Sequence, residues 1–228
     1  SSLKGKEGEE VLEHYNRTIL PTLGDQEGIV GEIFARVNSQ FRTPVNLREA
    51  IREIDEVEWS SIDVDIKGTA YETLLQRYAK EAKGAGQYFT PRPAIEAVVK
   101  ALDPEHDNEI HDPAAGTGGF LIRAFEHILE KTNEGLDLSR EERRALMTDN
   151  LSGMELVPET RRLGLMNLAL HDLQPQNFQI GDSLSPGPHT EQRYDLILTN
   201  PPYGGNQKKS RARDDFMVET KSPELNFV

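Results

Sequence analysis

The sequence predicts an α/β fold with a parallel, doubly wound sheet, preceded by an N-terminal helical domain. From about residue 109, short apolar segments of strand length alternate with segments of helical periodicity, which is the pattern of βα units. Before that point, apolar residues recur at helical spacing. The turn-forming segment KGAGQYFTPRP separates the two patterns. We therefore expect a helical domain at residues 1–84 and the sheet domain at residues 85–228.

The same periodicities predict the individual elements. In the first domain we expect helices at residues 29–37, 47–54 and 66–78. Asn46 is the expected N-cap of the second helix. In the sheet domain we expect strands near residue 110 and at residues 151–154, 178–180 and 194–199, and helices at residues 95–102, 120–129 and 161–171. Ser222 and Pro223 are typical of a helix start, so we expect the sequence to be a piece of a longer protein.

The composition excludes several classes of function. Apolar residues make up 36% of the 228 residues, which is enough for a sizeable core. The chain has no cysteine, so it has no disulfide, thiolate zinc site or cysteine nucleophile, and its six histidines lack metal-ligand spacing. No run approaches about 18 consecutive apolar residues, and SSLKGKEGEE lacks the apolar centre of a secretory signal. We expect a cytoplasmic protein with no metal and no membrane partner.

The segment HDPAAGTGGF joins the first expected strand to a helix and contains Gly116, Gly118 and Gly119. Glycines permit close backbone approach and a helix N-terminus presents free N–H groups, so this segment suits a nucleotide-like ligand. The glycine spacing differs from that of dinucleotide-binding turns, and no phosphate-binding lysine follows. A tight strand-to-helix connection without a ligand is the alternative interpretation.

Acidic residues follow three of the expected strands, at Asp112, Glu155 and Asp182. The carboxyl ends of parallel strands form one ligand crevice, so we expect these side chains to line one pocket. A carboxylate at the end of the second strand commonly binds ribose hydroxyls. Each acid alone is also explained as a turn residue or helix cap, but three in consecutive βα units favour a site.

The segment GQYFTPRP precedes the helix expected at residues 95–102. Thr90 is the expected N-cap of this helix and Pro91 its first residue. Such a helix end attracts a carboxylate. Tyr88 and Phe89 would cover an adenine or a methionine chain, or else belong to the core.

The fourth expected strand ends in TNPPYGG. Proline offers a carbonyl acceptor without an N–H donor and has a fixed φ. In doubly wound sheets the ligand lies where strand order reverses, commonly between the first and fourth strands, which would bring Asn200 beside the glycine turn. The Asn200 side-chain oxygen and the Pro201 carbonyl would accept both hydrogens of an exocyclic NH₂, and Tyr203 would stack on the base. This predicts chemistry on a nucleobase amine.

The net charge of −13 argues against a protein that binds nucleic acid over its whole surface. The segment KKSRAR nevertheless concentrates positive charge at Lys208, Lys209, Arg211 and Arg213. We interpret it as a loop that contacts phosphates. A solvated run of charges is the alternative.

Together DPAAGTGGF, GMELVPETRRLGLMNLALH, GDSL and LILTNPPYGG resemble the amino-methylating, S-adenosylmethionine-dependent DNA methyltransferases. GQYFTPR, the helical region before it and the MNLALH helix are similar to those of the modification subunit of type I restriction-modification systems. The resemblance extends from about Asn46 to Val228. It implies a Rossmann-like methyltransferase sheet that is truncated at its C-terminus here, because the family continues into further strands and a C-terminal helical region.

The resemblance implies methyl transfer from S-adenosyl-L-methionine to N6 of an adenine flipped out of double-stranded DNA. It also implies a specificity subunit and a restriction subunit as partners. The implied catalytic residues are Asn200, Pro201, Pro202 and Tyr203. With Asp112 and Gly116 from the expected pocket, the cofactor site comprises Gln87, Tyr88, Phe89, Thr90, Pro91, Arg92, Asp112, Gly116, Thr117, Gly118, Gly119, Glu155, near the ribose, and Asp182, near the adenine.

Other interpretations stay open. Gly181 to Leu184 match the nucleophile block of a lipase family, but the Asp-x-x-His spacing, at Asp103 to His106, precedes the serine. PPY would alternatively be a ligand for an aromatic groove. The chain would also fit a cofactor- and partner-binding fragment without independent activity. NPPY itself is compatible with other amines, such as cytosine N4, RNA guanine or protein glutamine, whereas the absence of cysteine excludes the cytosine-C5 route.

Overall fold

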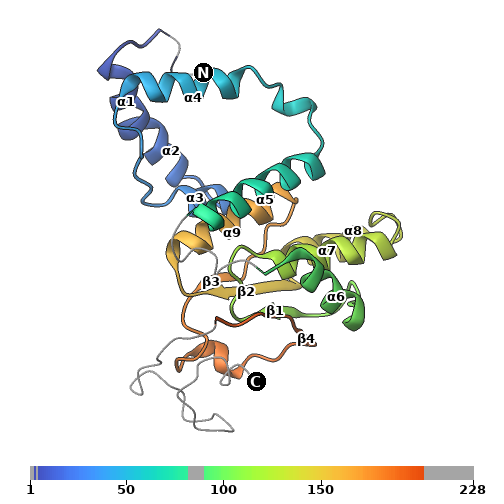
Figure 1. The fold of residues 1–228 in the computed structure, drawn as a ribbon. Helices are drawn as coiled ribbons and strands as arrows, with labels where there is room; N and C mark the ends of the chain where they lie inside the picture. Colours follow the sequence, from blue (N-terminus) through green and yellow to red (C-terminus); the bar gives the residue numbers. More distant parts are fainter. Residues whose placement is uncertain (1–2, 4, 82–89, 203–228) are drawn as a thin grey trace. The chain divides into compact units, whose positions relative to one another are not determined.

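The computed structural model describes residues 3, 5–81 and 90–202 (Figure 1). The chain divides into two compact units, residues 1–66 and 67–228. The long helix α5 (Val64–Glu81) therefore belongs almost wholly to the second unit. The expected domain boundary after residue 84 stays a prediction, because it falls outside the described residues. None of the described helices is long and apolar enough to cross a membrane.

The first unit is built from short helices. They are α1 (Glu9–His14), η1 (Tyr15–Ile19), α2 (Leu20–Gly24), α3 (Ile29–Phe34), α4 (Pro44–Asp55) and η2 (Trp59–Ser61). The N-cap of α4 is Thr43, whose hydroxyl accepts a hydrogen bond from the N–H of Asn46, so the N-cap expected at Asn46 is wrong. Pro44 explains the difference, because its missing N–H costs nothing at the first position of a helix.

The described residues of the second unit contain a sheet of four parallel strands, which confirms the expected fold class. They are β1 (Ile110–Asp112), β2 (Leu151–Glu155), β3 (Phe178–Ile180) and β4 (Leu196–Ile197). Their order in space is β3-β2-β1-β4, so the strand order reverses between β1 and β4. β4 is shorter than the strand expected at residues 194–199, although the N–H of Leu198 still donates to the carbonyl of His111 (3.0 Å).

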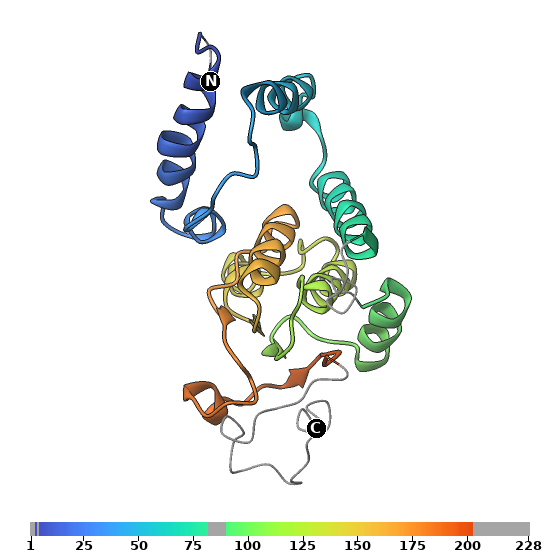
Figure 2. The same cartoon turned by 60° about the vertical axis from the view of Figure 1, so that its left-hand side comes forward.

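Helices α6 (Arg92–Leu102), α7 (Gly119–Lys131) and α9 (Pro158–Leu170) cover one face of this sheet (Figure 1, Figure 2). Right-handed crossovers place α7 and α9 on the same face, because these helices connect β1 to β2 and β2 to β3 in one direction. α6 precedes β1 and packs against α7. Phe178 packs so closely under α9 that a Cβ on Gly164 would lie 3.0 Å from its ring. The helix α8 (Arg140–Thr148) was not expected from the sequence; it starts at a capping box formed by Ser139 and Glu142.

The opposite face of the sheet carries polar side chains. Because side chains alternate along a strand, His111, Ser152 and Gln179 point away from α7 and α9. The ring of Tyr194 stacks on His111, with ring centroids 4.3 Å apart, and His111 Nδ1 lies 2.8 Å from the Ser152 hydroxyl. These residues line a groove of about 230 Å³. Burial lowers the pKa of His111 to about 4, so its ring is neutral at neutral pH.

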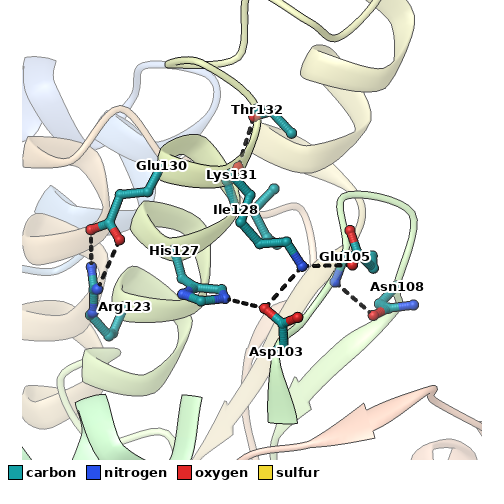
Figure 3. A network of polar contacts seen from close by, with 9 residues as sticks. All are labelled: Asp103, Glu105, Asn108, Arg123, His127, Ile128, Glu130, Lys131 and Thr132. Atoms are coloured by element: carbon teal, nitrogen blue, oxygen red, sulfur yellow. Dashed lines mark hydrogen bonds and ion pairs between the residues drawn. The ribbon is translucent and has the colours of Figure 1, made fainter. Parts of the chain in front are cut away.

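Charged side chains tie the end of α6 to α7 (Figure 3). Asp103 caps α6 in the left-handed backbone region, and its carboxylate contacts His127 Nε2 (2.7 Å) and Lys131 Nζ (2.9 Å). Lys131 also pairs with Glu105 (2.6 Å). Hydrogen bonds from Lys131 and His127 lower the pKa of the Asp103 carboxyl. Together with the packing of α6 on α7, this cluster fixes the two helices relative to each other.

Candidate functional site

The carboxyl ends of the four strands lie at one edge of the sheet. β1 ends at Asp112, β2 ends at Glu155, and Asn200 follows β4 by three residues. The backbone pairing of β4 with β1 makes the loops that leave these two strands neighbours. Strand order reverses between them, which is the usual ligand position in an open α/β sheet.

The loop after β1 is a tight glycine turn held by other segments. Gly116 and Gly118 have φ values of 54° and 80°, a region in which side chains are strained. The N–H of Gly116 donates to Oε2 of Glu155 (2.9 Å), and Nδ2 of Asn167 on α9 donates to the carbonyl of Thr117 (3.0 Å). The turn is therefore fixed from both β2 and α9.

Asp112 is almost completely buried beside this turn, at 1% exposure. The pKa of its carboxyl is raised to about 7, mainly by burial and to a smaller extent by the charge of Glu155. The hydroxyl of Thr199 lowers the same pKa, although it falls short of hydrogen-bond geometry. The N–H of Ala114 also lowers it through a hydrogen bond of 3.1 Å. Asp112 is thus a buried acid that ionises near neutral pH.

Glu155 keeps acceptor capacity for a ligand. It is 7% exposed and accepts hydrogen bonds from the N–H groups of Gly116 (2.9 Å) and Val157 (2.8 Å). A carboxylate offers about four lone-pair positions, so about two remain.

The loop after β3 reaches the same edge. Asp182 accepts hydrogen bonds from the N–H of Leu184 (3.0 Å) and the hydroxyl of Ser185 (2.9 Å). The hydroxyl of Ser183 donates to the carbonyl of Pro113 (2.5 Å), which joins the loops after β1 and β3. Because Ser183 is committed to a backbone carbonyl, this geometry gives no support to a serine nucleophile.

The start of α7 offers donors to a ligand. Gly118 is its N-cap, and no side chain from residues 3, 5–81 or 90–202 caps the first N–H groups of the helix. These groups and the positive end of the helix dipole attract oxygen-rich or anionic groups. Together with the carboxyl groups of Asp112 and Glu155, they suit a ligand that carries hydroxyls, a positive charge and a carboxylate.

The segment before α6 meets the loop after β4. Nδ2 of Asn200 donates to the hydroxyl of Thr90 at 3.2 Å, and both side chains are half-buried. The N-cap of α6 is Pro91 and the helix begins at Arg92, so the expected N-cap at Thr90 is wrong by one residue. Pro93, which also needs no N–H partner, takes the second helical position.

Arg92 is held at the start of α6 by an ion pair with Glu72 of α5. Burial raises the pKa of the Glu72 carboxyl, and the charge of Arg92 lowers it. This contact joins α5 to the segment that carries Thr90.

Some expected site residues lie outside the described residues, namely Gln87, Tyr88, Phe89, Tyr203, Lys208, Lys209, Arg211 and Arg213. Other contributors were not identified from the sequence: Asn167 and Ser183, which hold the glycine turn, and Thr199, which influences Asp112. The one signal for Asn167 was a polar residue on the apolar face of the MNLALH helix.

The fold and this crevice define a doubly wound α/β domain of the class that binds nucleotide-like ligands at the switch in strand order. The chain belongs to the N-6 DNA Methylase family, whose model matches residues 62–228. It is 35% identical to the type I restriction enzyme StySPI methylase subunit of Salmonella potsdam. The alignment is 236 positions long and covers 99% of this chain. These findings confirm the resemblance to type I modification subunits.

Solved structures agree with this assignment. One of them comes from a structural study of the complex assembly and conformational transition of the type I R-M system. It matches 96% of this chain with a TM-score of 0.78 and 28% identity. The EcoKI M protein matches 99% with a TM-score of 0.57 and 29% identity. The chain spans 44% of the StySPI subunit, 45% of the first of these structures and 42% of the second.

Proposed function

We propose that this chain is part of a modification subunit that transfers a methyl group from S-adenosyl-L-methionine to N6 of adenine in double-stranded DNA. The family supports methylation, and the similarity to type I subunits supports a specificity subunit and a restriction subunit as partners. The observation that carries the proposal is the junction of β1 and β4, because it joins the glycine turn to the loop of Asn200.

The residues of the crevice fit this cofactor. Glu155 retains lone pairs suited to ribose hydroxyls, and the uncapped N-terminus of α7 suits a carboxylate. Asp112, ionised above a pH of about 7, suits a positive charge. When bound, S-adenosylmethionine supplies a methyl group on a positively charged sulfur. By the family resemblance, Asp182 would lie near its adenine.

The chain itself would hold the amine that receives the methyl group. Oδ1 of Asn200 and the carbonyl of Pro201 would accept the two hydrogens of the N6 amine, which keeps the nitrogen lone pair out of conjugation with the ring. The target base must leave the duplex to reach this loop, which costs a few kcal/mol. Stacking on Tyr203, typically worth about 1 to 3 kcal/mol, would offset much of that cost.

Nucleoside analysis tests the proposal directly. The full-length subunit, with its partner subunits, is incubated with methyl-labelled S-adenosylmethionine and genomic DNA amplified in vitro, which carries every sequence without modification. We expect labelled N6-methyladenine. Labelled N4-methylcytosine, or label in RNA or protein instead of DNA, would assign the site to another amine and contradict the proposal.

One observation favours a second candidate for residues 1–228 taken alone. One face of the sheet presents a polar groove instead of packed helices among the described residues, whereas parallel sheets are normally covered on both faces. A fragment in this state would bind cofactor without turning over. Adenine methylation by residues 1–228 alone would contradict this second candidate. Binding of S-adenosylmethionine without methylation, weakened in Asp112→Ala, would support it.

A further inference from the structure

Thr90 makes a contact that an N-cap role does not explain. Pro91 caps α6 without any side-chain hydrogen bond, so the Thr90 hydroxyl is not used by the helix. Instead it accepts a hydrogen bond from Nδ2 of Asn200, which lies 110 residues further along the chain. We propose that Thr90 is a positioning residue that orients the side-chain amide of Asn200. This inference rests on the proposed function and extends it.

The hydrogen bond selects one of two orientations of the amide. An asparagine amide has one acceptor oxygen and one donor NH₂. With Nδ2 of Asn200 bound to Thr90, the oxygen Oδ1 is left as the free end, and within the described part of the chain it accepts no hydrogen bond. An amine needs this acceptor. The reversed amide would present two donors to an amine that itself donates, and methyl transfer would be impaired.

Thr90 can orient Asn200 because it lies two residues before the start of α6, and contacts along α6 fix that helix. The ion pair of Arg92 with Glu72 fixes the start of the helix. Ile95 is buried against Gly119, where an added Cβ would lie 3.0 Å from its Cδ1 atom. At the other end, the Asp103 cluster binds α6 to α7 (Figure 3). The helix α7, which follows the glycine turn, therefore also supports α6, and α6 in turn supports Thr90.

A contact of Thr90 with the cofactor, implied by the family resemblance, is a different role and does not conflict with this one. A threonine hydroxyl donates one hydrogen bond and accepts two. Accepting from Asn200 leaves its hydrogen available. The two roles differ in kinetics: orientation of Asn200 changes the rate constant of transfer, whereas a cofactor contact shared by ground and transition states changes affinity.

Thr90→Val tests the role, because valine keeps the shape and removes the hydroxyl. The full-length subunit in its assembled complex is given DNA amplified in vitro, and the single-turnover rate is measured at saturating S-adenosylmethionine beside the cofactor dissociation constant. We expect the rate to fall roughly tenfold to a hundredfold, as for a misplaced catalytic group, with little change in cofactor affinity. Thr90→Ser should restore most of the rate. Thr73→Val is the matched control, because the exposed hydroxyl of Thr73 donates to the carbonyl of Thr69 within α5 (2.9 Å).

Several outcomes would overturn the inference. A normal rate at saturating cofactor, with only the dissociation constant raised, would make Thr90 a cofactor contact alone. A Thr90→Ser variant as slow as Thr90→Val would indicate packing. In the Asn200→Ala background, Thr90→Val should cause no further loss of rate, and an additional loss would show that Thr90 acts independently of Asn200. An inactive unmodified protein would contradict the proposed function and this inference together, whereas an active one that Thr90→Val leaves unchanged would contradict this inference alone.

Discussion

The two halves of the crevice differ in how firmly the protein holds them. The glycine-turn half, defined as Asp112, Gly116 and Glu155, is buried, and a hydrogen bond between Gly116 and Glu155 crosses from one loop to another. The Asn200 half, defined as Thr90 and Asn200, is half-buried and joined by one hydrogen bond of 3.2 Å. A preformed site binds without an ordering cost. The difference suggests that the glycine-turn half governs cofactor affinity and stability, while the Asn200 half governs rate.

The largest effect is expected for Asn200→Ala. Removal of the acceptor oxygen should lower the rate of methyl transfer by roughly a hundredfold to a thousandfold, the usual effect of losing one group that stabilises a transition state. Cofactor affinity should stay near that of the unmodified protein, because the glycine-turn half is untouched. Single-turnover methylation and a cofactor titration measure the two quantities separately. A normal rate would remove Asn200 from the mechanism.

The second-largest effect is expected for Gly164→Ala, because Gly164 on α9 packs against the backbone of the glycine turn. The added Cβ would lie 3.0 Å from the backbone oxygen of Gly116 and 3.0 Å from the ring of Phe178. Overpacking of this kind typically costs roughly 1–3 kcal/mol, of which the higher helix propensity of alanine offsets about 1 kcal/mol. We expect a lower Tm and weaker cofactor binding, measured by thermal unfolding and titration.

Gly181→Ala is the matched control for that experiment. Its added Cβ would also lie 3.0 Å from a neighbour, but the neighbour is the flexible thioether of Met154. We expect both Tm and cofactor affinity to stay close to those of the unmodified protein. Equal losses in the two variants would mean that the turn of Gly116 has no special rigidity.

A smaller effect, with a defined pH dependence, is expected for Asp112→Asn. Burial raises the pKa of Asp112 from 3.8 to about 7, so between these values the folded state binds more protons than the unfolded state. The stability of the unmodified protein should therefore fall as pH rises from about 4 to about 7 and change little from this source above pH 7. The variant should lack this decline, so its Tm should exceed that of the unmodified protein more at pH 8 than at pH 5. Parallel Tm profiles would contradict the raised pKa.

The same substitution should weaken cofactor binding if Asp112 faces a positive charge. Affinity of the unmodified protein for S-adenosylmethionine should then increase as pH rises through about 7, where the carboxyl ionises. The affinity of the variant should be lower and independent of this ionisation. An unchanged affinity in the variant would separate Asp112 from the cofactor.

The smallest effect is expected for Lys100→Ala on the outer surface of α6. The ion pair of Lys100 with Glu96 (2.7 Å) is solvent-exposed, and such pairs contribute little to stability. We expect no measurable change in Tm, cofactor affinity or rate. A marked loss of rate would mean that α6 acts on the site through more than Thr90.

Local patterns in the sequence predicted the strands and the acids that follow them. Short segments around Ile110 and from Leu151 to Met154 predicted β1 and β2, because their apolar residues lie between helical patterns, as in βα units. α8 was missed, although Ser139 and Glu142 have the spacing of a capping box. The N-cap of α6 was misplaced, because Pro91 and Pro93 are both compatible with a helix start and the sequence alone does not choose between them.

Contacts between segments that are distant in the sequence could not be predicted from it. The hydrogen bond of Asn167 with Thr117 spans 50 residues, and that of Ser183 with Pro113 spans 70. Each depends on where the sheet brings two loops, and neither residue type indicates its partner. The contact of Thr90 with Asn200 is of the same kind. The sequence therefore predicted which strands and loops share one edge of the sheet, while the structure shows the side chains that hold those loops together.

The stacked rings of His111 and Tyr194 make the attachment of β4 observable in solution. An aromatic ring shifts the NMR resonances of protons held above it, so the imidazole protons of His111 should resonate upfield while β4 stays paired with β1. The pKa of His111 is about 4, so its ring does not titrate between about pH 6 and pH 8, and the shift can be measured there. Loss of the shift would report separation of the strand that leads to Asn200, and DNA added to the sample would reveal whether the substrate secures it.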